Sequence, residues 1–127
     1  MIRIKKLHTL VCLLSVIALV GCYNQGSEVI ATRRNIIDVG RVIVGDSISA
    51  TFKFRNNTHV DQIVNFHSES DSTEASSESM IIGLHKVGRL DVTVTLKSPG
   101  EFSKTVRVEA ANGDVFFNIT VKGRGTP

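Results

Sequence analysis

Apolar and polar side chains alternate along most of the chain from about residue 35 onward. The alternation is clearest in one segment, where every second position is apolar: Ile48, Ala50, Phe52 and Phe54. Side chains of a β-strand point alternately to its two faces, so this spacing predicts a strand with one face in a core and the other in solvent. The same period of two predicts further strands at residues 36–44, 60–66, 80–84, 90–96, 102–110 and 115–121.

Turn-forming dipeptides separate these segments: Gly45-Asp46, Asn56-Asn57, Pro99-Gly100 and Asn112-Gly113. About seven or eight short strands, with turn signals every 8–12 residues and no helical period, predict an all-β fold. We therefore expect an immunoglobulin-like β-sandwich of antiparallel strands over residues 35–123, followed by a tail at residues 124–127. This part of the chain has no Trp and no pair of cysteines, which excludes an antibody-type domain.

The register of the third predicted strand is ambiguous. Val60, Val64 and Phe66 share one face, but Ile63 lies on the opposite face. A strand buried on both faces, or a bulge, would explain this pattern.

Residues 68–79 differ in composition from the strands around them. They include six Ser and four acidic residues, and none of their side chains is large and apolar. Such a segment buries too little surface to offset the entropy lost on ordering, so we predict a mobile loop. Its carboxylates offer oxygen ligands for Ca²⁺, but their spacing matches no ordered site, and we favour a solvated loop.

Other candidate chemistry is weak. His59, His67 and His85 are possible zinc ligands, but they lie in separate turns or strand ends without a paired spacing, and we expect no metal site. Ser, His and Asp are present without a Gly-x-Ser-x-Gly turn, and no helix follows Gly123-Arg124-Gly125. We therefore expect a protein without catalytic residues and without a cofactor, and we identify no small-molecule substrate.

The first 22 residues show the pattern of an export signal. A basic start, with Arg3, Lys5 and Lys6, precedes an uncharged run that is too short to span a bilayer of about 30 Å as a helix. The run ends in Leu19-Val20-Gly21-Cys22, which resembles the lipobox of bacterial lipoproteins. An uncleaved or buried N-terminal helix is the alternative, which we do not favour because the run is apolar on all sides.

The lipobox resemblance implies how the protein is attached and where it is located. It implies a signal peptide at residues 1–21, acylation of Cys22 (palmitate or a similar chain) and residues 22–34 as a tether to the membrane. Tyr23, rather than Asp, follows the cysteine, which implies an outer-membrane lipoprotein facing the periplasm if the source is Gram-negative.

The charge argues against nucleic-acid binding, and the cysteine content argues against thiol chemistry. Three of the 15 basic residues belong to the signal, which leaves 12 basic and 12 acidic residues in the exported part. A formally neutral domain gives no electrostatic case for nucleic-acid binding. Because Cys12 leaves with the signal and Cys22 carries lipid, the folded part has no thiol for a disulfide or a metal site.

Several spaced motifs together resemble a bacterial domain family of unknown function: Asp38-Val39-Gly40, Phe52-Lys53-Phe54-Arg55-Asn56, Val87-Gly88, Pro99-Gly100-Glu101-Phe102 and Val121-Lys122-Gly123. Exported members of that family have an immunoglobulin-like sandwich related to hydin-type and major-sperm-protein-type domains. The resemblance covers about residues 36–123. Many members carry a Ser-Cys-Gly-Cys-Thr segment where this chain has residues 67–73 without cysteine, so no thiol or metal chemistry carries over.

One aromatic side chain is a candidate contact. By alternation, Phe116 points away from Val115 and Phe117. It is either an exposed anchor for a partner or is covered by a neighbouring loop. We predict a membrane-anchored, non-enzymatic module that binds or scaffolds another envelope protein, with a ligand or metal carrier using residues 68–79 as the alternative.

Overall fold

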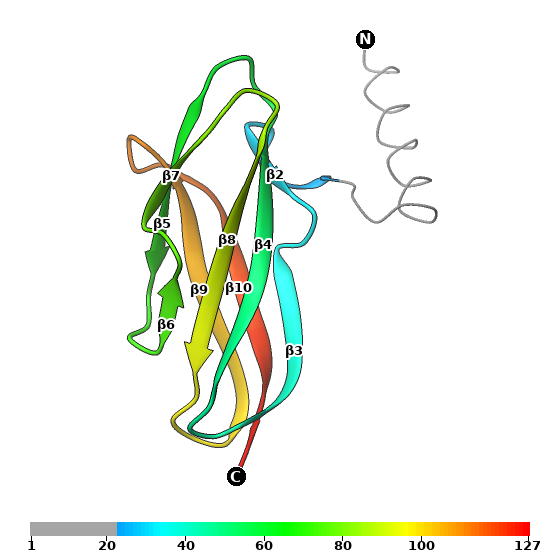
Figure 1. Cartoon of the computed structure of the whole chain (residues 1–127), viewed down its shortest axis with the longest axis vertical. Coiled ribbons are helices and arrows are strands. Elements are labelled where there is room, and N and C mark those ends of the chain that lie inside the picture. The colour runs from blue at the N-terminus through cyan, green and yellow to red at the C-terminus, as the bar shows by residue number, and fades with distance from the viewer. Residues whose placement is uncertain (1–22) are drawn as a thin grey trace, which may run out of the picture.

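The computed structural model describes residues 23–127, in which two five-stranded β-sheets pack face to face (Figure 1). In spatial order the first sheet contains β1 (Gln25–Gly26), β2 (Ile30–Thr32), β4 (Ser47–Asn56), β8 (Val87–Thr95) and β6 (Thr73–Ala75). The second contains β3 (Ile36–Ile43), β10 (Val115–Thr126), β9 (Gly100–Ala110), β5 (Gln62–Ser68) and β7 (Ser79–Ile82). Neighbouring strands are antiparallel except β3, which runs parallel to β10. The predicted immunoglobulin-like sandwich is confirmed.

The core forms where the inward faces of the two sheets meet. Phe52 and Phe54 of β4 are buried as the alternation predicted, and Ile48 is half-buried at the end of the row. The ring of Phe54 lies 5.5 Å from that of Phe66 in the opposite sheet. Burying such large rings contributes much of the stability of a domain this small.

The tether predicted at residues 22–34 is wrong from Gln25 onward, where β1 already pairs with β2. Ile30, Ala31 and Thr32 are buried and form β2, which pairs with residues 54–56 of β4. The chain then crosses at residues 33–35 from the first sheet into β3 of the second. The strand before this crossover is only three residues long, so it shows no alternation in the sequence.

The tail predicted at residues 124–127 is wrong as well, because β10 continues to Thr126. Arg124, Gly125 and Thr126 pair with residues 41–43 of β3. A Cβ on Gly125 would lie 3.0 Å from the carbonyl oxygen of Ser98, so this glycine allows close packing rather than ending a strand.

Residues 68–79 contain a strand, contrary to the loop we predicted. Thr73 is buried, and β6 pairs with residues 92–94 of β8. The hydroxyl of Ser68 donates to the carbonyl oxygen of Thr73 at 2.9 Å, and the backbone N–H of Asp91 donates to Ser76 Oγ at 3.0 Å. Serine hydroxyls thus supply hydrogen bonds that hold this segment without large apolar side chains.

Within residues 23–127, the structure contains no helix with the length and apolar character needed to cross a membrane. The predicted signal peptide and Cys22 lie outside the described residues.

Candidate functional site

Exposed apolar side chains gather on the outer face of β5 and β7. Ile63 in β5 pairs directly with Ile81 in β7, and 47% and 70% of their surfaces are exposed. Val64 and Phe66 face the core, so the ambiguous pattern of this strand arises because Ile63 is exposed to solvent. Neither of the two explanations offered from the sequence, burial on both faces or a bulge, applies. The directly opposed pair of exposed isoleucines forms a small apolar patch on this face.

The free edge of β7 lacks the features that protect sheet edges. Its four residues include no charge and no Pro, and its pairing with β5 has no register shift. On an edge strand, alternate N–H and C=O groups point away from the sheet and can pair with another chain. The opposite edge, β3, is blunted by a register shift opposite Lys122 and Arg124 and by exposed Asp38 and Arg41.

The structure brings two of the three candidate histidines together. The rings of His59 and His85, in the loops before β5 and before β8, meet edge to face with centroids 5.1 Å apart. His85 has a left-handed backbone with φ of 57°. His67 lies near the other end of β5, opposite Arg107. Among residues 23–127, no group of three or more His, Cys, Asp or Glu side chains is arranged to hold a metal ion.

An acidic hollow of about 660 Å³ opens between β5 and β6 at one side of the sandwich. Glu74, Glu78 and Glu109 line it, with no Lys or Arg among the lining residues. Thr73, which also lines it, is 4% exposed, and its Oγ1 has no hydrogen-bond partner within residues 23–127. A buried hydroxyl without a partner is costly, so this hollow is suited to a polar ligand.

Serine and histidine also occur side by side in the acidic hollow, without forming a nucleophile and its base. Ser68 Oγ donates to the carbonyl oxygens of Ser70 at 3.1 Å and Thr73 at 2.9 Å. A catalytic serine instead donates to its general base. The hydroxyl of Ser68 therefore has a structural role.

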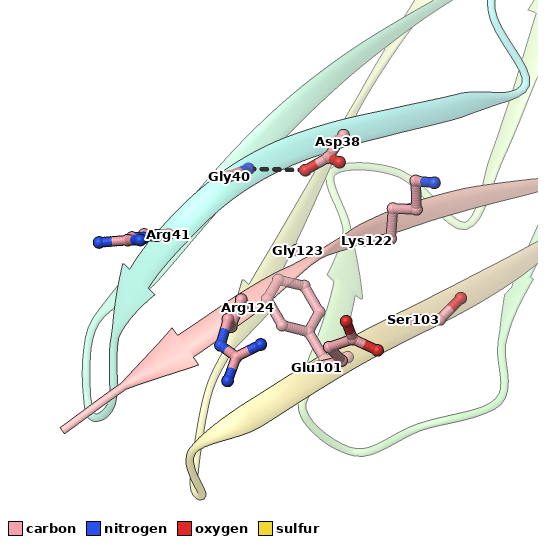
Figure 2. A pocket seen from close by; sticks show the side chains of 9 residues that line it. Asp38, Gly40, Arg41, Glu101, Ser103, Lys122, Gly123 and Arg124 are labelled. Carbon is pink, nitrogen blue, oxygen red and sulfur yellow. Dashed lines mark hydrogen bonds between the residues drawn. The ribbon is translucent and has the colours of Figure 1, made fainter.

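A second hollow, of about 550 Å³, lies over β3, β9 and β10 (Figure 2). It exists because Gly40 and Gly123 have no side chains at the point where β3 shifts its register against β10. Figure 2 shows side chains of both charges around it, among them Asp38, Glu101 and Lys122. Such a mixed rim has no strong preference for a cation or an anion.

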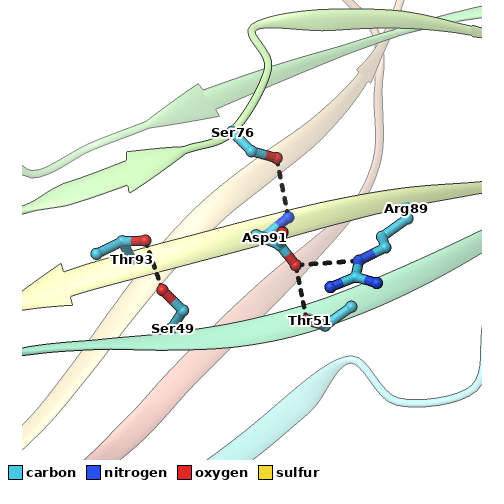
Figure 3. Close-up of polar contacts among 6 residues, drawn as sticks. All are labelled: Ser49, Thr51, Ser76, Arg89, Asp91 and Thr93. Carbon is cyan, nitrogen blue, oxygen red and sulfur yellow. Dashed lines mark hydrogen bonds and ion pairs between the residues drawn. The ribbon is translucent and has the colours of Figure 1, made fainter.

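The outer face of β4 and β8 is a ladder of polar pairs (Figure 3). Ser49 and Thr93 share a hydrogen bond of 2.7 Å, and Thr51 donates to Asp91 at 2.6 Å. The Thr51 hydroxyl, together with the neighbouring Arg89 guanidinium, lowers the pKa of Asp91 below its ordinary value. These groups bond to each other, so this face is a structural surface.

Phe116 is half-buried and packs against the core. It lies in the part of β10 that pairs with β9 alone, because the pairing of β10 with β3 begins only at Thr120. The pairing of β10 with β9 shifts at this residue, so strict alternation does not hold here. Its role as a partner contact stays a prediction.

Residues 30–124 match the family described as "Protein of unknown function (DUF1573)". The chain belongs to this family. No curated protein matches the chain in sequence. The resemblance to a bacterial family of unknown function is thereby confirmed, while the lipoprotein signal and the missing Cys-Gly-Cys segment stay predictions.

Several solved structures have a fold similar to that of this DUF1573 chain. A PapD-like domain of human CEP192 is 11% identical with a TM-score of 0.65, covering 79% of this chain and 87% of that one. WR4, a C. elegans MSP family member, is 11% identical with a TM-score of 0.54, covering 78% and 99%. The E. coli chaperone DraB is 10% identical with a TM-score of 0.54, covering 77% and 54%. These similarities establish the fold.

Proposed function

We propose that this DUF1573 chain is a non-enzymatic, lipid-anchored module that binds another protein of the cell envelope through the edge of β7. Two features of β7 support the proposal: its unprotected backbone edge and the Ile63–Ile81 pair beside it. A partner strand added to β7 would gain backbone hydrogen bonds, and its alternate side chains would cover the two isoleucines. Relatives of the same fold include a chaperone, DraB, which is in keeping with a protein-binding role.

Site-specific crosslinking tests the edge directly, because residues 23–127 contain no cysteine. A photo-crosslinker attached to Ser79→Cys, in β7, should give one defined adduct in intact cells. The same reagent on Lys97→Cys, in the turn before β9, should give none. Equal adducts from both positions would count against the proposed edge.

A matched pair of substitutions separates the edge from general surface effects. Ile81→Lys should abolish the Ser79→Cys adduct, since a charge on this face prevents an apolar partner from packing there. Ile36→Lys makes the same change at a residue that is 51% exposed on the blunted β3 edge, and it should leave the adduct unchanged. Both variants should keep the parent Tm, because both side chains are exposed.

The proposed anchor has its own test. Mass spectrometry of the membrane-extracted protein should show Cys22 as the first residue carrying acyl chains. Cys22→Ser should move the protein into the soluble fraction. An unmodified Cys22 would reject the anchor without affecting the β7 edge.

A second candidate function is supported by the unpartnered Thr73 hydroxyl in the acidic hollow. Three glutamates and a free hydroxyl suit an organic cation such as a polyamine. Spermidine should raise the Tm of the parent protein, and should raise that of Glu74→Gln/Glu78→Gln less. Calcium in place of spermidine tests the metal alternative. Equal Tm shifts in the parent protein and the variant would reject the site.

A further inference from the structure

A third hollow, of about 360 Å³, lies where the chain crosses from the first sheet to the second. Its lining includes Arg33 and Arg34 of the crossover together with Lys53 of β4 and Arg89 of β8. No Asp or Glu lines it. Residues 23–127 carry equal numbers of basic and acidic side chains, and four of the basic ones line this one hollow, where Asp91 partly offsets the charge of Arg89.

Lys53 and Arg89 face each other directly across β4 and β8. Like charges at directly opposed positions destabilise a sheet. Asp91 compensates Arg89 at 3.3 Å. Within residues 23–127, no hydrogen bond or ion pair holds the side chains of Lys53 and Arg34. An anion in the hollow would relieve this repulsion.

The donors around the hollow suit a phosphate group. A guanidinium from Arg34 offers forked N–H donors and the Lys53 ammonium adds a point charge, the two kinds of side chain that bind phosphate most often. Thr51 also lines the hollow, but its hydroxyl already donates to Asp91.

The hollow lies beside the point where the chain enters the sandwich. The side-chain oxygen of Gln25, in β1, accepts a hydrogen bond of 3.0 Å from the backbone N–H of Asn35 in the crossover. Only Tyr23 and Asn24 separate Cys22 from Gln25 in the sequence, and an extended chain spans about 3.6 Å per residue. A lipid on Cys22 would therefore bring membrane headgroups to this edge.

We propose that the crossover hollow binds the phosphate of an anionic phospholipid, so that this edge of the sandwich rests on the membrane. The inference rests on the lipid anchor in the proposed function and deepens it. It also fixes an orientation: β2 and β3 lie on one side of the molecule and β5, β6 and β7 on the other (Figure 1). The β7 edge then points away from the membrane toward a partner.

Vesicle co-sedimentation tests the proposal with the chain from Tyr23 to Pro127, which contains both sheets and the whole described core and has no lipid of its own. It should bind vesicles of phosphatidylcholine mixed with phosphatidylglycerol, and it should not bind phosphatidylcholine alone. Each cation near an anionic surface contributes about 1 kcal/mol, so Arg34→Ser/Lys53→Ser should weaken binding roughly 30-fold. Lys122→Ser/Arg124→Ser removes the same charge from the mixed hollow of Figure 2 and should weaken binding only slightly.

Three outcomes would overturn the proposal. The first is a complete lack of binding to phosphatidylglycerol vesicles at low salt. The second is an equal loss in both double variants, which would indicate attraction by net charge alone. The third is that inorganic phosphate binds, as detected by NMR shifts at Arg34 and Lys53, while vesicles do not bind. This result would indicate a soluble anion as the ligand. Because this chain lacks Cys22, a failure here is distinct from a failure of the anchor, which the mass of Cys22 decides.

Discussion

Gly123 faces the carbonyl oxygen of Gly40 so closely that a Cβ on Gly123 would lie 2.6 Å from that oxygen. The contact joins β10 to β3 at the shift of register. Gly123→Ala would push β3 away from β10, and we expect a loss of about 2–3 kcal/mol in the free energy of unfolding. For a domain of this size the Tm should fall by roughly 10–20 °C. Urea and thermal unfolding followed by circular dichroism measure both values.

Gly40→Ala is the matched control, since nothing lies within 4 Å of a Cβ at this position. Its φ of +74° is unfavourable for Ala, so we expect a smaller loss of about 1 kcal/mol. If Gly123→Ala loses no more free energy of unfolding than Gly40→Ala, the close contact between the two strands does not exclude a side chain at residue 123.

Asn56 should be the most sensitive polar residue of the fold. It is fully buried at the end of β4, and its Nδ2 donates to the carbonyl oxygens of Val60 at 2.7 Å and Ile82 at 2.9 Å. Its Oδ1 accepts from the N–H and the hydroxyl of Thr58. Asn56→Asp places a carboxylate against two carbonyl oxygens, and we expect a loss of about 3 kcal/mol or more in urea unfolding. Asn57→Asp, one residue later and exposed, should change the value by about 0.5 kcal/mol or less.

The parts of the fold that follow strict alternation were predictable, because a period of two is visible when several alternate positions in a row are apolar. Phe52 and Phe54 illustrate this, since both are buried where the pattern places them. The three buried residues of β2 are too few to show any period, and their burial depends on pairing with β4, which is distant in the sequence. Thr73 was missed for another reason: β6 is held by hydrogen bonds and by pairing with β8, and composition does not reveal either.

The candidate sites were less predictable than the fold. The Ile63–Ile81 pair depends on the register between β5 and β7, which no local pattern specifies. The crossover hollow combines residues of the crossover with Lys53 and Arg89, which lie side by side only because β4 pairs with β8. In the sequence these are scattered charges in a neutral domain, and only the topology gathers them.

The hydrogen bond from Thr51 to Asp91 should make part of the stability depend on pH. The pKa of Asp91 is lowered in the folded protein, chiefly by the Thr51 hydroxyl and then by Arg89. A lowered folded-state pKa adds stability above the unfolded-state pKa, about 3.9, and this stability is lost as the pH falls through the folded-state value. Thr51→Val should therefore lower the Tm by roughly 1–3 °C at pH 7, a small effect because the carboxylate is 40% exposed.

The same variant should approach the parent protein at low pH. Once Asp91 is protonated in both proteins, the charge-assisted bond no longer distinguishes them. Thermal unfolding at pH 7 and near pH 2 measures the two differences. A difference that grows toward low pH would reverse the sign and contradict the lowered pKa.

Replacing Phe116 should cost more free energy of unfolding than replacing its neighbour Val115, which is the reverse of what strict alternation predicts. Val115 is paired with Glu109 and Phe117 with Val108, so Phe116 is an extra residue in β10 and the alternation slips there. Val115 is left 51% exposed, and Phe116 is half-buried against the core. Complete burial of Phe makes its truncation cost about 3–5 kcal/mol, so half-burial predicts a loss of about 1–2 kcal/mol for Phe116→Ser. Val115→Ser should change the free energy of unfolding by about 0.5 kcal/mol or less. A larger loss for Val115→Ser in urea unfolding would mean that the strand keeps its alternation without the extra residue, and Phe116 would then be exposed and available to a partner.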